Sequence, residues 1–177
     1  MDKPEFLYHA SENTDIQIFE PRKNSFRDPS EGPVIFATPD KTMSSVFIVP
    51  ANDSWTHSGL FGNVHYFICG DEERFKNVDK GGAIYQLPSA TFETDPTKGL
   101  GIREWVSKVP VKPLNKEVFE SGLEAMLLMG VQVYFVDDEI FKTIDRSSDH
   151  GNELMRNTVS ENTKRMINVF EIPLVQD

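Results

Sequence analysis

Short apolar runs separated by polar turns dominate the first half of the chain. Runs of about four to eight residues rich in aromatic and β-branched side chains, bounded by Pro or Gly, are typical of buried strands. This pattern predicts strands over residues 5–9, 34–38, 64–69, 83–87 and 90–94. The polar segments 22–33 and 50–63 contain Pro and Gly and are expected to be loops.

Helical spacing of apolar residues marks other parts of the chain. Asp40 stands before apolar residues at positions 43, 46 and 47, which predicts a short helix with Asp40 as its N-terminal cap. The best helical pattern covers Lys116–Met129 and ends at Gly130, a residue that suits a C-terminal cap. Weaker helical patterns cover residues 71–75, 138–144 and 152–169.

The remaining extended patterns decide the expected fold class. They cover residues 103–111, 131–136 and 170–175, and the last of these contains Pro173, which favours an edge strand. Strands and helices do not alternate regularly along the chain, so a doubly wound parallel sheet is disfavoured. We therefore expect an α+β fold with mixed, mostly antiparallel sheets and a few helices. With 177 residues, the chain is expected to form a single globular domain over 1–177.

Composition limits the possible partners. The formal net charge is −10, which argues against broad electrostatic capture of nucleic acid or of an anionic membrane. The single cysteine, Cys69, permits no intrachain disulfide and fits a reducing compartment. The first ten residues lack the apolar core of a secretory signal, and no apolar run is long enough to span a membrane. We therefore expect a cytoplasmic protein.

Common catalytic and metal-binding motifs are missing from the sequence. There is no GxGxxG after a strand, no P-loop, no HExxH, no GxSxG and no CxxC pair. His57, His65 and Cys69 lie near one another in sequence, but a buried thiol beside a strand histidine is the more ordinary interpretation, and we predict no metal site. Cys69 is also a poor nucleophile candidate, because an apolar strand should raise the pKa of its thiol.

Three segments, in order along the chain, carry the most informative candidate chemistry. The first is residues 7–11 (LYHAS), where a predicted strand ends in a histidine and a small hydroxyl residue. The second is residues 32–38 (GPVIFAT), followed by Phe47 on the predicted helix. The third is residues 103–113 (REWVSKVPVKP), with Glu104 at the start of a predicted strand.

This ordered trio resembles the ADP-ribosyltransferase fold of the diphtheria-toxin and poly(ADP-ribose) polymerase type. It is also similar to patterns in bacterial rifampin-modifying ADP-ribosyltransferases and RNA 2′-phosphotransferases. In that family a YHG[ST] strand supplies a histidine, a GIYFA strand and the next helix supply aromatic rings, and a late strand opens with a glutamate. The resemblance covers residues 6–49 and 102–114 as core motifs, and residues 115–177 would be a C-terminal helical cover. It implies an ADP-ribosyltransferase-like fold with NAD as the substrate.

The resemblance also implies roles for two catalytic residues. Cleavage of the N-glycosidic bond of NAD builds positive charge on the ribose, so a carboxylate is needed beside that sugar. By resemblance, Glu104 would supply this carboxylate. His9 would hold the adenosine-side ribose through a hydrogen bond from a rigid strand, with Ser11 nearby.

Four further residues are implied as contacts for NAD. Phe36 or Phe47 would stack against the positively charged nicotinamide ring. Backbone N–H and C=O groups of Ala10 would bind the nicotinamide carboxamide. Arg27, in the loop between the first two motifs, would help to neutralise the pyrophosphate.

Each of these residues also has an ordinary structural interpretation. His9 could be a half-buried structural histidine, the two phenylalanines core residues, and Glu104 a solvent-exposed acid at a strand end. The loop cations Arg22, Lys23 and Arg27 could simply be solvated.

Two departures from the family pattern shape the hypotheses. Ala10 stands where the family usually has Gly, and Ile35 where it usually has Tyr. The leading hypothesis is an NAD-binding mono-ADP-ribosyltransferase-like enzyme with an unknown protein or small-molecule acceptor. The alternative is a catalytically inactive relative, or an acidic protein-interaction module without enzymatic activity. A phosphoester-processing enzyme of the RNA 2′-phosphotransferase type is a weaker third hypothesis, because the composition does not suggest a strongly basic pocket.

Overall fold

A computed structural model gives the fold and describes residues 2–23, 30–146, 153, 156 and 169–170. In chain order, its elements within these residues are β1 (Phe6–Ser11), β2 (Ile35–Ala37), α1 (Lys41–Ser45), β3 (Thr56–Phe61), β4 (Val64–Cys69), α2 (Glu72–Val78), β5 (Gly82–Pro88), the 3-10 helix η1 (Gly101–Arg103), β6 (Trp105–Ser107), β7 (Asn115–Phe119), α3 (Gly122–Leu128), β8 (Gln132–Phe135), α4 (Asp138–Arg146) and β9 (Val169–Phe170).

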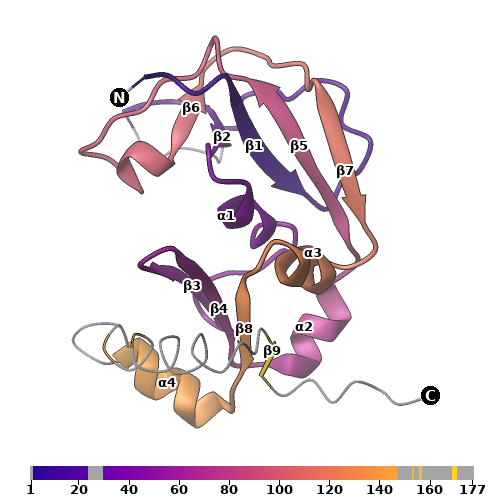
Figure 1. The fold of residues 1–177 in the computed structure, drawn as a ribbon, viewed down its shortest axis with the longest axis vertical. Coiled ribbons are helices and arrows are strands. Elements are labelled where there is room, and N and C mark those ends of the chain that lie inside the picture. The colour runs from indigo at the N-terminus through magenta and orange to yellow at the C-terminus, as the bar shows by residue number, and fades with distance from the viewer. Residues whose placement is uncertain (1, 24–29, 147–152, 154–155, 157–168, 171–177) are drawn as a thin grey trace.

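Two layers of sheet lie above and below helix α1 (Figure 1). The first contains the antiparallel sheet β1-β5-β7 and the antiparallel pair β2-β6. Backbone hydrogen bonds between Tyr8 and Thr38 link them, with N···O distances of 2.7 and 2.9 Å. The second is the sheet β3-β4-β8-β9, in which β3 and β4 are antiparallel while β8 pairs in parallel with β4 and β9. The expected mixed, mostly antiparallel α+β class is therefore confirmed.

Buried apolar clusters lie on both sides of the α1 level. One cluster fills the first layer, with Leu7, Tyr85 and Trp105 among its members. A second lies between the other sheet and helices α2 and α3, and a third lies between that sheet and α4. A fourth joins the layers, where Ile48 after α1 packs with Ile84 of β5. The two sheets are thus fixed relative to one another by buried apolar contacts.

The carboxylate of Asp79 ties the end of α2 to the start of α3. Its Oδ1 accepts hydrogen bonds from the backbone N–H of Gly122 (2.6 Å) and of Gly81 (3.1 Å), and its Oδ2 accepts one from Leu123 N–H (3.0 Å). These N–H groups include donors that the first turn of a helix leaves without an intrahelical partner. Gly122 has no room for a side chain, because a Cβ there would collide with Val49. The junction between α2 and α3 therefore needs a hydrogen-bond-accepting aspartate at position 79 and a glycine at position 122.

Several predicted elements are confirmed, and two predictions were wrong. Strands form close to 5–9, 34–38, 64–69, 83–87 and 131–136, and helices begin after Asp40, Asp71 and Asp137 as expected. The predicted helix Lys116–Met129 is instead the strand β7 followed by the shorter helix α3. The predicted loop 50–63 contains strand β3.

The reasons for these two differences are local. Ser121 caps α3, because its Oγ accepts a hydrogen bond from the Glu124 backbone N–H at 2.9 Å, so the helix starts after this residue. The segment before it pairs with β5 along Gly82–Gln86. Gly62, with φ of 60°, and Asn63 form the turn that folds β3 back against β4.

Other expected strands are shorter than the sequence pattern suggested. Residues 90–94 contribute one bridge, Glu93 to Val106, and residues 103–111 split into η1, β6 and a bridge at Val111. The expected helical cover 115–177 includes β7 of the first layer and β8 of the second sheet, so it contributes strands to both. Most of the helix predicted over 152–169 and of the strand predicted over 170–175 lies outside the described residues.

Candidate functional site

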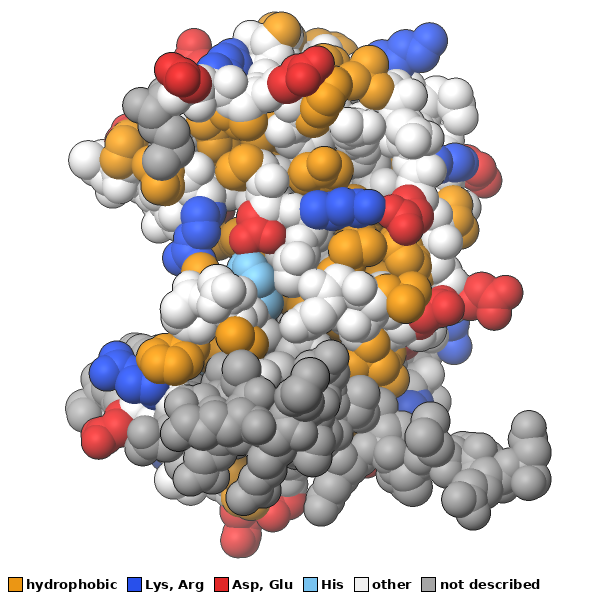
Figure 2. Space-filling view, in the orientation of Figure 1, with side chains coloured by type: hydrophobic (Ala, Val, Ile, Leu, Met, Phe, Trp, Pro, Cys, Tyr) orange, Lys and Arg blue, Asp and Glu red, His pale blue; other side chains and the backbone are white. Residues whose placement is uncertain are grey.

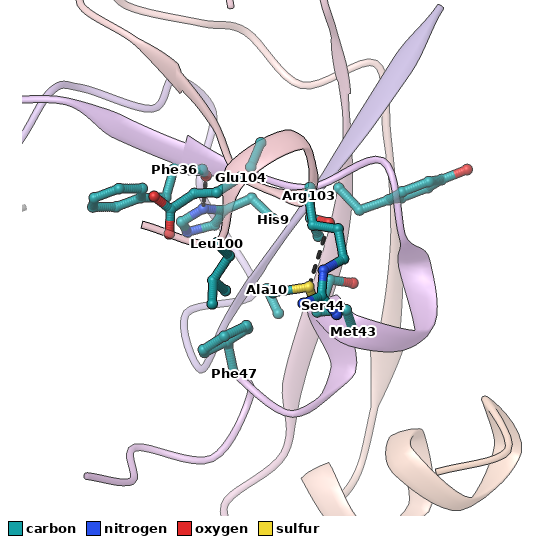
Figure 3. A pocket seen from close by; sticks show the side chains of 12 residues that line it. His9, Ala10, Phe36, Met43, Ser44, Phe47, Leu100, Arg103 and Glu104 are labelled. Atoms are coloured by element: carbon teal, nitrogen blue, oxygen red, sulfur yellow. Dashed lines mark hydrogen bonds between the residues drawn. The ribbon is translucent and has the colours of Figure 1, made fainter. Parts of the chain in front are cut away.

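A pocket of about 290 Å³ lies beside α1 and η1, against β1 and β2 of the first layer (Figure 3). In the space-filling view, the outline narrows at this level, and hydrophobic, basic, acidic and histidine side chains meet at the left of the waist (Figure 2). The volume is near the lower end of the roughly 300–1,000 Å³ typical of small-molecule sites. Its lining residues are Tyr8, His9, Ala10, Phe36, Ala37, Thr38, Met43, Ser44, Phe47, Leu100, Arg103 and Glu104.

His9, on β1, is held in one orientation by its neighbours. Its Nδ1 lies 2.6 Å from the carbonyl oxygen of Phe36, and its ring makes an edge contact with Phe19 at a centroid distance of 4.7 Å. Burial, followed by a smaller contribution from the positive charge of Arg22, lowers the pKa of His9 below its ordinary value, despite the bond to Phe36. The neutral ring donates its Nδ1–H to this carbonyl and leaves Nε2 as an acceptor.

Ala10 presents backbone groups at the same edge of β1. Tyr8 uses its N–H and C=O to bond Thr38, on the side of β1 away from β5. Successive residues of a strand direct these groups to opposite edges, so Ala10 directs its own pair to the same edge as Tyr8. At that point the neighbouring chain has left the sheet to form α1. Ala10 therefore offers a donor and an acceptor at the pocket.

Glu104 lines the pocket from a part of the chain that is distant in sequence from His9. It follows η1 and immediately precedes β6, and its carboxylate oxygen Oε1 is buried. Thr94 Oγ1 lies 2.8 Å from the backbone carbonyl oxygen of Glu104, which fixes the chain at this corner. Glu104 is therefore half-buried in a pocket rather than a solvated strand-end acid. In the close-up its carboxylate lies on the same side of the pocket as the His9 ring (Figure 3).

Two phenylalanine rings complete the pocket wall. Phe36 of β2 lines it and is half-buried, whereas its neighbour Ile35 turns into the core with 4% exposure. The ring that β2 presents to the pocket is thus Phe36, which has no hydroxyl group. Phe47 lies just beyond the end of α1 rather than on it, and it is 54% exposed. Phe47 is therefore not a core residue.

Arg103 is a cation of the site that the sequence analysis missed. It ends η1 and lines both this pocket and a neighbouring cavity. Within the described part of the chain, its guanidinium makes no hydrogen bond or ion pair. The sequence signal was its position directly before Glu104, in the motif itself. Arg27, predicted for the pyrophosphate, lies outside the described residues.

The remaining candidates lie apart from the pocket. Ser11 is on β1 but is not part of the lining, and its Oγ accepts a hydrogen bond from Asn13 N–H at 3.2 Å. Cys69 is buried, and burial raises the pKa of its thiol to about 11, as the sequence indicated. Across the described ranges, no three His, Cys, Asp or Glu residues are grouped so that they could hold a metal ion.

Comparisons with protein-family models, with curated proteins and with solved structures find no match to this chain. Among the described residues, no helix has the length and apolar character needed to cross a membrane.

Proposed function

We propose that this protein binds NAD and transfers its ADP-ribose to an acceptor, as a mono-ADP-ribosyltransferase-like enzyme with an ADP-ribosyltransferase-like fold. One observation carries the proposal: His9, Ala10 and Glu104, from distant parts of the chain, line a single pocket together with two phenylalanine rings. These are the residues that the resemblance in the sequence assigns to NAD. His9 and Ala10 are far from Glu104 in sequence, so their sequence positions alone would not place them in one pocket.

The pocket wall suits a nicotinamide group. A positively charged ring is attracted to the face of an aromatic side chain, and Phe36 and Phe47 both line the pocket. The carboxamide of nicotinamide has one acceptor oxygen and an NH₂ donor. The N–H and C=O of Ala10, directed to the pocket edge of β1, can bind both at once.

Glu104 would act on the bond that breaks. When the bond between ribose C1′ and the nicotinamide nitrogen breaks, its electron pair goes to that nitrogen, and the ring becomes neutral. Positive charge then develops on the ribose. A carboxylate whose oxygen is removed from water stabilises this charge more strongly than a solvated one, because the local dielectric is lower.

His9 and Arg103 would position the rest of the substrate. With Nδ1–H committed to the Phe36 carbonyl, Nε2 of His9 can accept a hydrogen bond from a ribose hydroxyl. Arg103 provides a guanidinium at the edge of the pocket, where it can bind a pyrophosphate through charge-assisted hydrogen bonds. The positive charge of Arg103 would attract the pyrophosphate locally, although the chain as a whole has a net charge of −10.

The direct test is whether the purified protein releases nicotinamide from NAD, measured by chromatography. Glu104→Gln keeps the shape of the side chain and one acceptor oxygen but removes its charge. We expect it to lower kcat at least a hundredfold while the affinity for nicotinamide is retained. Arg103→Ala should instead raise KM for NAD about tenfold, the loss expected for one charge-assisted contact of about 1.5 kcal/mol.

Glu93→Gln is the matched control for the test at Glu104. Glu93 is an exposed glutamate that bridges to β6 but does not line the pocket. It should leave turnover unchanged. Protein that binds NAD but releases no nicotinamide would be an inactive relative, and protein whose thermal stability is unchanged by millimolar NAD would refute the proposal.

A further inference from the structure

A second cavity of about 170 Å³ adjoins the pocket. The two share Met43, Phe47, Leu100 and Arg103 as walls, so a molecule in the second cavity would lie against one in the first. The other walls come from α1 and from the β3-β4 hairpin of the opposite sheet, and they are Val46, Ser58, Gly59, Leu60, His65 and Tyr66. None of these six residues has a part in the proposed binding of NAD.

A buried histidine lines this second cavity and is held by an aspartate. Nε2 of His65 lies 2.7 Å from Oδ2 of Asp40, and the His65 side chain is 9% exposed. Oδ1 of Asp40 accepts the backbone N–H of Met43 at 3.0 Å, which fixes the carboxylate at the start of α1. A carboxylate only accepts hydrogen bonds, so Nε2 of His65 donates its N–H to Asp40, and in the neutral tautomer the lone pair is on Nδ1. Within the described part of the chain, Nδ1 makes no hydrogen bond.

The mouth of the cleft is apolar. Phe47, Leu60, Leu100 and Ile102 are exposed by 54%, 36%, 45% and 45%, and all four lie on the cavity wall or on the adjoining turn η1. Inside, the phenol of Tyr66 covers Gly59, where any Cβ would collide with it. Burial raises the pKa of Tyr66, so its hydroxyl stays protonated. A surface of this kind favours an uncharged, largely apolar ligand over a phosphate or a charged peptide.

We propose that the second cavity is the acceptor subsite for a small apolar molecule bearing a hydroxyl group, and that His65 is the base that takes the hydroxyl proton. In the step, the acceptor oxygen forms a bond to ribose C1′ as the bond from C1′ to nicotinamide breaks. The electron pair of the broken bond leaves with nicotinamide, and the hydroxyl proton passes to Nδ1 of His65. This inference rests on the proposed function, and it identifies the acceptor class of the same site.

Asp40 would be a positioning residue for this base. Asp40→Asn keeps an oxygen to cap α1, but it turns its NH₂ toward His65. Nε2 must then accept, so the ring proton moves to Nδ1 and the base is lost without loss of the side chain. In serine proteases the corresponding Asp→Asn change lowers kcat about 10,000-fold through the wrong tautomer.

The experiment supplies NAD with benzyl alcohol, and in parallel with ethylene glycol, a polar alcohol. Mass spectrometry counts ADP-ribosyl adduct and free ADP-ribose, which is the product of water as acceptor. We expect the wild type to form the benzyl adduct in preference to the glycol adduct. Asp40→Asn and His65→Gln should lower the adduct-to-hydrolysis ratio at least tenfold, since general bases contribute about 100- to 10,000-fold. A purely structural role would not change this ratio, because hydrolysis would fall with transfer.

His57→Gln is the control, because it removes a histidine from the same hairpin but outside the cavity. It should leave the ratio unchanged. If NAD is cleaved but no benzyl adduct forms, or if Asp40→Asn keeps the wild-type ratio, the acceptor subsite is refuted while the proposed function stands. If the wild type does not cleave NAD, both are refuted.

Discussion

Single residues of the pocket combine a neutral histidine with a half-buried acid and a half-buried cation. Burial disfavours the charged form of His9 and lowers its pKa. Glu104 contributes a buried carboxylate oxygen, and Arg103 lines the pocket beside it. Such combinations are typical of sites where charge develops during a reaction. The same burial has a consequence for stability that can be measured without any ligand.

Acid should destabilise this protein through His9. Above pH 6.5, His9 is neutral in both the folded and the unfolded chain and contributes no pH dependence. Below pH 6.5 the unfolded chain takes up a proton, while the folded ring, with its lower pKa, does not. Stability is therefore lost as the pH falls through this window, by at most about 1.4 kcal/mol per pH unit. His9→Asn keeps a donor for the Phe36 carbonyl and removes the titrating ring.

Urea denaturation at pH 7.5 and at pH 5.5 measures this effect. The loss of unfolding free energy between the two pH values should be smaller in His9→Asn than in the wild type. His57→Asn, which removes a histidine of β3 that does not line the pocket, is measured alongside as the control for the loss of one histidine. Equal acid sensitivity of wild type and His9→Asn would contradict a lowered pKa for His9.

At the scale of elements, polar side chains at helix starts set the boundaries that apolar spacing misjudged. Ser121, followed by Glu124 three residues later, is a capping pattern visible in the sequence, and it places the start of α3 inside the predicted helix 116–129. The apolar spacing continued through this cap because Phe119, buried at the end of β7, stands four residues before Leu123, a spacing that also fits a helix. The pair Gly62-Asn63 between two apolar runs was likewise a hairpin signal. Pairing partners far along the chain, such as β5 for β7, have no local signal.

Asp79 offers the sharpest test at this scale, because three backbone N–H groups from two turns depend on one carboxylate. Asp79→Ala removes all three acceptor contacts and should lower the free energy of unfolding by about 2–3 kcal/mol. Asp79→Asn keeps one oxygen and should lose less. Asp53→Ala, at an exposed loop position, is the control and should change stability by less than about 0.5 kcal/mol. Chemical denaturation measures the free energy of unfolding of the three variants. An Asp79→Ala variant as stable as the wild type would show that the Asp79 hydrogen bonds do not stabilise the α2–α3 junction.

At the scale of the whole molecule, the pocket and the adjoining second cavity together depend on both sheets, which pack against α1 from opposite sides. The motif residues His9, Phe36 and Glu104 could be picked from the sequence because their neighbours in the chain form recognisable runs. Arg103 lay within the same motif as Glu104 but was not singled out. His65 could not be assigned from the sequence, since its place is set by packing between layers that are distant in sequence. Sequence patterns thus identified residues of the pocket wall that the first layer forms. The wall of the second cavity that β3 and β4 form could be identified only from the structure.

Binding of NAD together with an acceptor alcohol should therefore slow hydrogen exchange in both sheet layers. NAD bound to Glu104→Gln, which is expected to bind without turnover, would contact β1 and β2 on one side and the η1 turn shared with the β3-β4 cavity on the other. Because bound ligand stabilises the folded state by about 2.7 kcal/mol at 100 times its Kd, local opening at the site should become rarer. Hydrogen exchange measured by mass spectrometry should slow in peptides covering residues 6–11, 35–47 and 100–107 and, when benzyl alcohol is added, also in 58–66. Residues 138–146 of α4, on the far side of the second sheet, should exchange unchanged. Protection confined to the first layer with both ligands present would place the alcohol outside the second cavity.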